Sequence, residues 1–427
     1  MSKQKFTTIT EHEVSGAKAF EPISIPYIRV GCDYFKKVES VDRYGIIKQQ
    51  IRGWKKDTIK DDFEKEYLKQ IPKYDFFYTE PDNLNYKPSF RNGYNLYYPF
   101  QHIEKMGDFK WSHILMEQIF GDQIGLGYRL MQCYYLHPNR MMPILVLVSK
   151  LRQTGKSTFL NWLTMIFGDN TVMVNSEDLK NSFNSLYITA SWIFVEETLI
   201  EGNATVEKLK MMATAKTASV NQKFVAQYQI PFYGKFILTS NHEDKFAKID
   251  QEEIRFFVRN LGMPKHTNHY IEDDLKNEIP AFLHHLSHLP DVDFSIGRVP
   301  FTTEELKNDS LDKVKNESRP GLYKDLRMRF EDSFNNENAG KPFFLCNALD
   351  IKNRWYSHNN QIEPNYIRKI LKDEFMLKAE LMQKYYPFNI EYTKTPSGLS
   401  ENIPKVSGTP YKIDRQLIED KNCTNES

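Results

Sequence analysis

The sequence has few cysteines, and their positions suggest no site. Cys32, Cys133, Cys346 and Cys423 lie far apart, and no two of them form a C-x-x-C pair. This spacing excludes the disulfide framework of small secreted domains and contains no zinc-binding motif. We therefore expect reduced thiols in an intracellular protein.

The sequence also lacks a membrane-length apolar run and an excess of either charge. No stretch of about 18 consecutive apolar residues occurs, and the first residues, MSKQKFTTITEHEVSG, contain no apolar signal core. The 57 basic and 56 acidic residues nearly cancel, which excludes a globally cationic surface for nucleic acid. We expect a soluble, cytoplasmic protein with no membrane partner, whose contacts with nucleic acid are local.

A phosphate-binding motif is present, although its first glycine is missing. Residues 149–158 read SKLRQTGKST, which fits G-x-x-x-x-G-K-[ST] except that Lys150 replaces the first glycine. The preceding segment, PILVLV (143–148), is an unbroken apolar run typical of a buried parallel strand. The following segment has one apolar helical face, which ends at Gly168. Strand, loop and helix in this order are the context that a phosphate loop requires.

The residues of this loop suit ATP and Mg²⁺. Gly155 lets the backbone approach the phosphates, Lys156 supplies positive charge for the β- and γ-phosphates, and the Ser157 hydroxyl can bind Mg²⁺. We expect the nucleotide to be held by Gln153, Thr154, Gly155, Lys156, Ser157 and Thr158.

The segment after the loop alternates between strands and helices. Further strands are predicted at 170–176, 191–198, 234–241 and 254–261, with a helix over 177–187. Such alternation predicts an α/β core with a central, mostly parallel sheet.

Polar side chains follow two of these strands. Glu196 and Glu197 come after the apolar run WIFV, where an unpaired buried charge is unfavourable. We expect Glu196 to hold Mg²⁺, directly or through water, and Glu197 to orient or deprotonate the attacking water. Asn241 ends KFILTSN and is expected to contact the γ-phosphate and that water. The alternative interpretations are a solvated strand end for the acids and an ordinary turn for the asparagine.

Two arginines accompany the last strand. Arg255 and Arg259 are four residues apart, so in a strand they would share a face. Arg255 is the candidate that reaches the γ-phosphate of a neighbouring subunit. The structural alternative is a local ion pair, such as Arg259 with Glu253.

Together, the phosphate loop, VEE, LTSN and the trailing arginine resemble the motifs of superfamily 3 helicases, in the primase-associated branch of poxviruses and phages. The resemblance covers about residues 94–261. It implies an AAA+ core, hydrolysis of ATP between the subunits of a hexameric ring, and translocation on single-stranded or forked DNA. A separate primase or polymerase is a partner compatible with that function. For a phage or mobile element, the location would be the bacterial host cell.

The resemblance also implies a basic β-hairpin between the acidic pair and the asparagine strand. Lys216 and Lys223 are its candidate nucleic-acid contacts, with a solvated loop as the alternative. In the family's G-x-x-G-T-G-K-S pattern, Gln153 replaces the inner glycine. Because glycine serves where φ is positive or space is short, the two replacements predict a stiffer loop and slow hydrolysis.

The fold class predicted for the chain is α/β, with an AAA+-like P-loop NTPase core between two accessory domains. The C-terminal domain is expected to be mainly helical and compatible with a winged helix, and the residues after Asn402 are expected to be frayed. The predicted divisions are an N-terminal α+β domain, a helical segment, the NTPase core, a helical lid and the C-terminal domain, at 1–100, 101–140, 141–262, 263–300 and 301–427.

A histidine pair in the predicted lid is a weaker candidate. His284 and His288 in FLHHLSH lie one helical turn apart, as metal ligands can. No glutamate separates them and no third ligand is evident, so a helix packed over the core is the preferred interpretation.

Three functions are compatible with these motifs. The first is an ATP-driven DNA helicase or translocase. The second is an ATP-regulated replication initiator, or a DNA-binding ring without unwinding activity. The third is a degenerate scaffold, which the retention of Lys156, Ser157, Glu196, Glu197 and Asn241 disfavours.

Overall fold

The computed structural model describes residues 25–41, 47–63, 65–196, 199–200, 203–221, 228–295, 297, 299–394 and 400–419. Contacts divide the chain into two compact units, Met1–Tyr78 with Pro88–Asn95, and Thr79–Lys87 with Leu96–Ser427. Within the described ranges, no helix is both long enough and apolar enough to cross a bilayer.

The first unit is a small α+β structure. Its main sheet has the order β3-β2-β1-β4, and a three-stranded sheet has the order β5-β7-β6. Tyr27, Ile59 and Ile71 form its buried centre. The strands and helices are β1 (Tyr27–Val30), β2 (Asp33–Val41), β3 (Ile47–Trp54), α1 (Lys56–Asp62), α2 (Tyr67–Gln70), β4 (Lys73–Tyr74), β5 (Phe76–Tyr78), β6 (Ser89–Phe90) and β7 (Gly93–Asn95).

The second unit is built on a five-stranded sheet of order β14-β8-β13-β10-β9. Every neighbouring pair is parallel, as the sequence predicts. The strands are β8 (Ile144–Val148), β9 (Thr171–Val174), β10 (Trp192–Val195), β13 (Lys235–Ser240) and β14 (Phe256–Asn260). Leu145 and Leu147 point into one core, whereas Ile144, Val146 and Val148 belong to another. The sheet is therefore buried on both faces, which explains the unbroken apolar runs.

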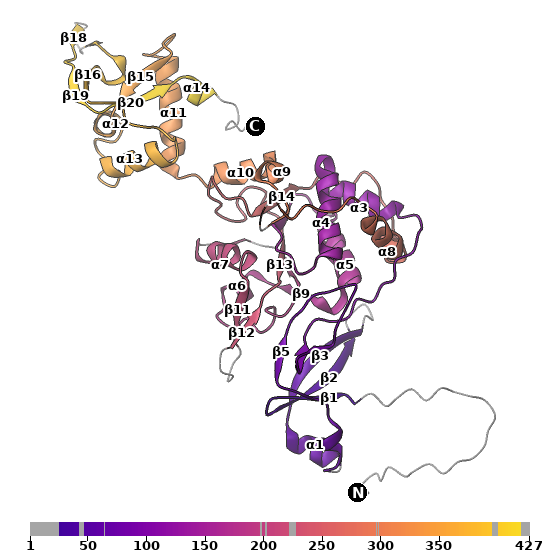
Figure 1. Cartoon of the computed structure of the whole chain (residues 1–427). Coiled ribbons are helices and arrows are strands. Elements are labelled where there is room, and N and C mark those ends of the chain that lie inside the picture. The colour runs from indigo at the N-terminus through magenta and orange to yellow at the C-terminus, as the bar shows by residue number, and fades with distance from the viewer. Residues whose placement is uncertain are drawn as a thin grey trace, which may run out of the picture. The chain divides into compact units, whose positions relative to one another are not determined.

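Helices cover both faces of this sheet (Figure 1). Five share one core with it, namely α3 (Lys110–Phe120), α4 (Ile124–Leu136), α5 (Lys156–Phe167), α8 (Ile271–Ser287) and the short α9 (Thr303–Leu306). The other core contains residues of α6 (Ser176–Lys180), α7 (Asn203–Ala213) and α10 (Asp309–Glu317), and of the hairpin β11 (Thr217–Val220) and β12 (Tyr228–Pro231).

One helix is shorter than the sequence predicts. The helix predicted for 177–187 is only α6, because the segment after it bonds to the hairpin instead. Asn184 Nδ2 donates to Ser219 O at 2.8 Å, and Asn221 Nδ2 donates to Ser182 O at 2.9 Å. Such side-chain bonds to the backbone compete with helix formation. The helix predicted to pack over the core is present as α8, which shares a core with α3, α4 and α5.

Helix α8 also completes the start of α3. The Glu278 carboxylate accepts from the backbone N–H of Trp111 at 3.0 Å and of Ser112 at 2.7 Å, and from the Ser112 hydroxyl at 2.9 Å. These N–H groups have no partner within their own helix. A carboxylate distant in sequence therefore caps α3.

The C-terminal part has its own core, and it combines helices with strands of three or four residues. Leu326, Phe330, Phe344, Ile351 and Ile413 are among its buried residues. Strand β20 pairs with β15, so the expectation that the chain frays after Asn402 is wrong as far as residue 419. Its elements are α11 (Gly321–Asn335), β15 (Phe343–Cys346), α12 (Ala348–Trp355), α13 (Pro364–Asp373), β16 (Gln383–Tyr385), β17 (Tyr392–Lys394), β18 (Ser400–Asn402), β19 (Val406–Gly408), β20 (Tyr411–Asp414) and α14 (Gln416–Glu419).

Candidate functional site

The predicted phosphate loop lies at the carboxyl edge of the parallel sheet. It joins β8 to α5, and β13 and β10 end at the same edge because the three strands are parallel and in register. Helix α5 begins at Lys156, directly after Gly155. Ligands of open α/β sheets bind at this edge, and the N-terminus of a helix attracts anions.

The two non-glycine positions of the loop differ in backbone conformation. Gln153 has a φ of +59°, which L-residues adopt with strain, whereas Lys150 is not among the described residues with positive φ. Gly155 has a φ of +94°, and an added Cβ there would make only ordinary contacts. Glycine is thus needed at 155 for its backbone angle, would relieve strain at 153, and is not required at 150.

Residues outside the motif hold the loop in place. Ser149 is fully buried, and its hydroxyl donates to Leu261 O at 2.7 Å and accepts from Leu151 N at 3.1 Å. Gln118 of α3 donates to Thr154 O at 3.1 Å and to Gly262 O at 2.8 Å. The sequence analysis missed Gln118, because nothing in its local pattern marks a residue that supports a loop 36 positions later.

Lys156 and Asn241 meet at this edge. The Lys156 ammonium donates to Asn241 Oδ1 at 3.1 Å and to Ser149 O at 3.2 Å. Partial burial lowers the pKa of Lys156, an effect that the Glu243 carboxylate opposes. The oxygens of Asn241 and Ser149 therefore hold the Lys156 ammonium, and phosphate oxygens could take their place as acceptors.

The other predicted ligands vary in their surroundings. Glu196 directly follows β10 and is half-buried, and Ser157 is exposed in the first turn of α5. Thr154 is 2% exposed, and its hydroxyl has no hydrogen-bond partner among the residues that the structure describes. Glu197 lies outside the described residues. Carboxylate, hydroxyl and ammonium groups at one edge can together bind a nucleotide and a divalent cation.

A second acid also reaches the loop. Glu243 Oε1 accepts from the backbone N–H of Lys150 at 3.1 Å, and its Oε2 lies 3.6 Å from the Lys150 ammonium. The segment NHED after β13 gave no signal for this contact, because its partner is distant in sequence. Glu243 thus neutralises the extra lysine in the loop.

Arg255 lies at the opposite edge of the sheet. It directly precedes β14, and its carbonyl accepts from Ile144 N, at the start of β8. Five residues of strand, about 15 Å, separate it from the phosphate loop of its own subunit. Its guanidinium lies 3.5 Å from Glu253 Oε2 and is partly exposed. The role of Arg255 towards a neighbouring subunit stays a prediction.

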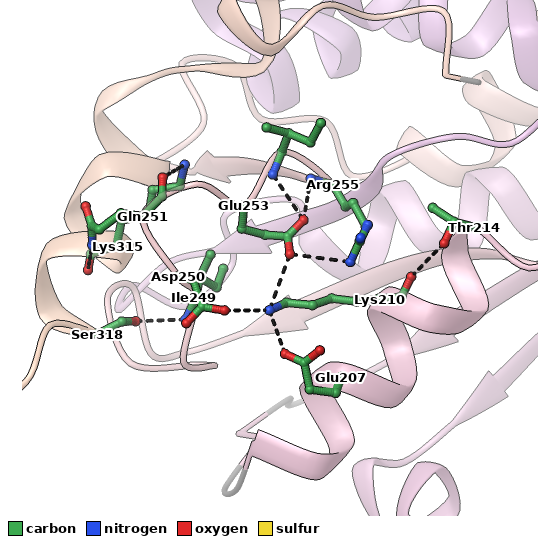
Figure 2. A network of polar contacts seen from close by, with 11 residues as sticks. Glu207, Lys210, Thr214, Ile249, Asp250, Gln251, Glu253, Arg255, Lys315 and Ser318 are labelled. Carbon is green, nitrogen blue, oxygen red and sulfur yellow. Dashed lines mark hydrogen bonds and ion pairs between the residues drawn. The ribbon is translucent and has the colours of Figure 1, made fainter. Parts of the chain in front are cut away.

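A buried lysine organises the residues around Arg255 (Figure 2). The Lys210 side chain is 4% exposed, and its ammonium lies 2.8 Å from Glu207, 2.9 Å from Asp250 and 3.3 Å from Glu253. Burial lowers the pKa of Lys210, but the hydrogen bonds with Glu207 and Asp250 and the charge of Glu253 outweigh burial, so the pKa is raised overall. Lys210 therefore stays charged and links α7 to the segment before Arg255.

Arg259 has a structural role. It is 9% exposed, donates to Asp122 Oδ1 at 2.8 Å and also bonds the Gln123 side chain. The proposed pairing with Glu253 is wrong, since Glu253 contacts Arg255 and Lys210 instead. Arg255 precedes β14, so the two arginines do not form the expected pair on one face of a strand.

The predicted hairpin is present as β11 and β12, which pair antiparallel. Lys216 precedes β11, and its carbonyl accepts from Phe232 N at 3.0 Å, so it lies at the base of the hairpin and not at its tip. Lys216 also lines a pocket of about 270 Å³ with Arg140 and Tyr233. Lys223 lies outside the described residues. Contact of either lysine with DNA stays a prediction.

Another buried lysine lies at the amino edge of the sheet. Lys235 begins β13, is 2% exposed and donates to the carbonyls of Pro138 and Tyr233. Burial lowers its pKa to about 7. Its hydrogen bonds are satisfied within the fold, which indicates a structural residue.

Comparisons with known proteins agree with the fold and leave the activity open. A family model described as a family of unknown function, DUF5906, matches residues 147–256. No curated protein matches the sequence. The apo structure of the C-terminal region of NrS-1 (305–718) is similar, with a TM-score of 0.58 and 13% identity over 91% of this chain and 95% of that chain. An A form of the same region has a TM-score of 0.51 and 14% identity over 83% and 84%. At these identities the likeness is one of fold.

Proposed function

We propose that this chain is an ATP-driven helicase or translocase that acts on DNA in the replication of a phage or mobile element. The observation that carries the proposal is the contact of Lys156 with Asn241 and Ser149 at the carboxyl edge of the sheet. Glu196 follows the neighbouring strand at the same edge. This edge thus offers a lysine, an amide and a carboxylate beside a helix N-terminus. Such groups suit a nucleoside triphosphate.

The residues present fit ATP and Mg²⁺. Gly155, with its φ of +94°, brings the loop backbone to the start of α5, and Lys156 would exchange its two oxygen partners for phosphate oxygens. Ser157 and Glu196 would hold Mg²⁺, which neutralises phosphate charge when bound. Asn241 would orient a water. From its sequence position, Glu197 is the candidate base.

The position of Arg255 supports a ring of subunits. It is partly exposed at the edge opposite its own phosphate loop. An arginine in that place can act only on the nucleotide of a neighbour, which is how an arginine supplied in trans stabilises transition-state charge. We therefore propose that catalytic sites lie between subunits.

The hairpin is the proposed contact with single-stranded or forked DNA. Lys216 is exposed at its base, and Tyr228, at the start of β12, is 39% exposed. A cation for the backbone and an aromatic ring for base stacking suit binding without sequence preference.

One observation favours the alternative, an ATP-regulated initiator or DNA-binding ring without unwinding activity. Gln153 takes a strained positive φ inside the phosphate loop. A loop under strain favours slow turnover, which suffices for nucleotide-controlled assembly and limits rapid translocation.

The test combines three measurements on the whole purified chain with Mg²⁺: phosphate release from ATP, separation of a forked duplex, and oligomer mass. We expect hydrolysis stimulated by DNA and lost in Lys156→Ala and Glu197→Gln. Lys150→Ala is the matched control, because its side chain is 67% exposed at the edge of the same loop. Absence of hydrolysis with single-stranded DNA, forked DNA and RNA would overturn the proposal. Hydrolysis without strand separation would favour the initiator.

A further inference from the structure

The pair His284 and His288 has a third potential ligand, which the sequence did not reveal. Glu104 lies in the extended segment before α3, and both histidines lie near the C-terminal end of α8. One ligand atom from each of the three side chains lies within 4.8 Å of the others. Among the residues that the structure describes, Glu104, His284 and His288 are the one group of histidine and acidic side chains close enough to hold a metal ion.

We propose that Glu104, His284 and His288 form a binding site for a divalent transition-metal ion, with Zn²⁺ as the expected occupant. Two imidazoles and one carboxylate are a ligand set that zinc accepts, with bonds of about 2.0–2.2 Å and a fourth position for water. Tetrahedral bonds of that length place ligand atoms about 3.3 Å apart. The ligand atoms lie up to 4.8 Å apart, so the side chains must rotate inward to bind a metal ion.

The hydrogen bonds of His288 leave its outer nitrogen ready to coordinate. Nδ1 of His288 lies 2.7 Å from the carbonyl oxygen of His284. A carbonyl can only accept, so Nδ1 carries the proton and Nε2 has the lone pair. Metal-binding histidines commonly donate their other N–H to a backbone carbonyl in this way, which fixes the tautomer and the ring.

The carboxylate of Glu104 is oriented by two hydroxyl groups. Tyr135 donates to Oε1 at 2.7 Å, and Ser287 donates to Oε2 at 2.7 Å. Such hydrogen bonds hold metal-binding carboxylates in place.

The charges of the cluster suit a cation better than two protonated histidines. The ring centroids of His284 and His288 are 4.1 Å apart, so two positive rings would repel one another. A simple ion pair of one protonated His284 with Glu104, at 3.9 Å, is the competing explanation. It predicts no affinity for metal, so binding measurements distinguish the two.

The metal would fasten the extended segment to α8. A backbone bond from Lys105 N to Pro280 O at 3.1 Å already joins them, and Glu104 lies beside it in sequence. A metal bridge would add a second attachment, one helical turn or more further along α8. The proposed role of this site is to stabilise the fold.

The test is titration of the whole chain, stripped with chelator, with Co²⁺ and Zn²⁺. We expect one Co²⁺ per chain with visible absorption typical of four-coordinate Co²⁺, displacement by Zn²⁺, and a Tm raised by Zn²⁺. His288→Ala and Glu104→Gln should weaken binding by at least about tenfold. Both changes are mild, since His288 is exposed and glutamine can still accept from Tyr135.

His266→Ala is the matched control, because His266 is exposed and outside the cluster. Its metal affinity should equal that of the wild type. The proposal is overturned if Co²⁺ does not bind below about 1 mM, or if His288→Ala and Glu104→Gln bind it as well as wild type while their circular dichroism shows an intact fold. Neither outcome depends on ATP hydrolysis.

Discussion

The polar side chains at the two edges of the parallel sheet differ in the partners that they contact. At the carboxyl edge, Ser157 is exposed, and no described residue forms an ion pair with Glu196. At the amino edge, Lys210 contacts three carboxylates, and Lys235 donates to two carbonyls. Polar groups that satisfy one another stabilise the fold, whereas polar groups left for a ligand serve binding. The comparison predicts that substitutions at one edge affect activity and those at the other affect stability.

The largest effect is expected at the carboxyl edge. Glu196→Gln should reduce ATP hydrolysis by at least about 100-fold, because an amide is a poor ligand for Mg²⁺. The free energy of unfolding should change by less than about 0.5 kcal/mol, since the carboxylate has no ion-pair partner among the residues that the structure describes. Phosphate release and urea unfolding measure the two quantities. A strongly destabilised variant would contradict the division between the edges.

The counterpart at the amino edge is Lys210→Met. Removing the ammonium leaves Glu253, whose side chain is 8% exposed, with one fewer cation, so we expect a loss of about 2 kcal/mol of unfolding free energy. The value is below that of a fully buried pair because Arg255 and two backbone N–H groups still contact Glu253.

Nucleotide binding by Lys210→Met, measured with a fluorescent ATP analogue, should stay within about threefold of wild type, which is less than one pKd unit. The double variant Lys210→Met/Glu253→Gln should recover part of the stability, because it removes the uncompensated charge. If Lys210→Met unfolds at the same urea concentration as wild type, the network contributes nothing measurable.

The smallest effect is expected within the phosphate loop, where the strained position 153 can be compared with the unstrained position 150. Gln153→Gly relieves a positive φ that is unfavourable by about 1–2 kcal/mol and adds about 0.5–1 kcal/mol of chain entropy. We therefore expect a gain near 1 kcal/mol in unfolding free energy and faster hydrolysis. Lys150→Gly has no strain to relieve and should lose about 0.5–1 kcal/mol. Equal shifts in the two variants, measured by urea unfolding, would show that the strain at Gln153 is unimportant.

Much of the sheet and its active edge could be predicted from the sequence. Strands buried on both faces leave apolar runs that are visible without any partner, and parallel strands bring their carboxyl ends together. For that reason Asn241 and Lys156 could be placed at the same edge from the pattern alone, although the hydrogen bond between them was not predicted. The positive φ at Gln153 was foreseeable too, because glycine usually occupies that position in the family that the loop resembles.

The supporting residues could not be predicted, because their partners are distant in sequence. Gln118, Glu243 and Glu104 each contact a group that only the fold brings near. A polar residue in a loop or on a helix face has the same local pattern whether it meets solvent or a partner. The short C-terminal strands were missed for a similar reason, since strands of three or four residues have too few positions to establish a period.

The cap that Glu278 places on α3 bears on where this protein can be cut. The family model ends at residue 256, before α8, yet α8 contributes Leu275, Ile279, Phe282 and Leu286 to the core that it shares with α3 and α5. A fragment ending at the boundary of the matched family would expose those contacts and leave the first N–H groups of α3 without acceptors. The smallest part of this unit that folds cooperatively therefore extends at least through Ser287, and begins before the family match, with α3.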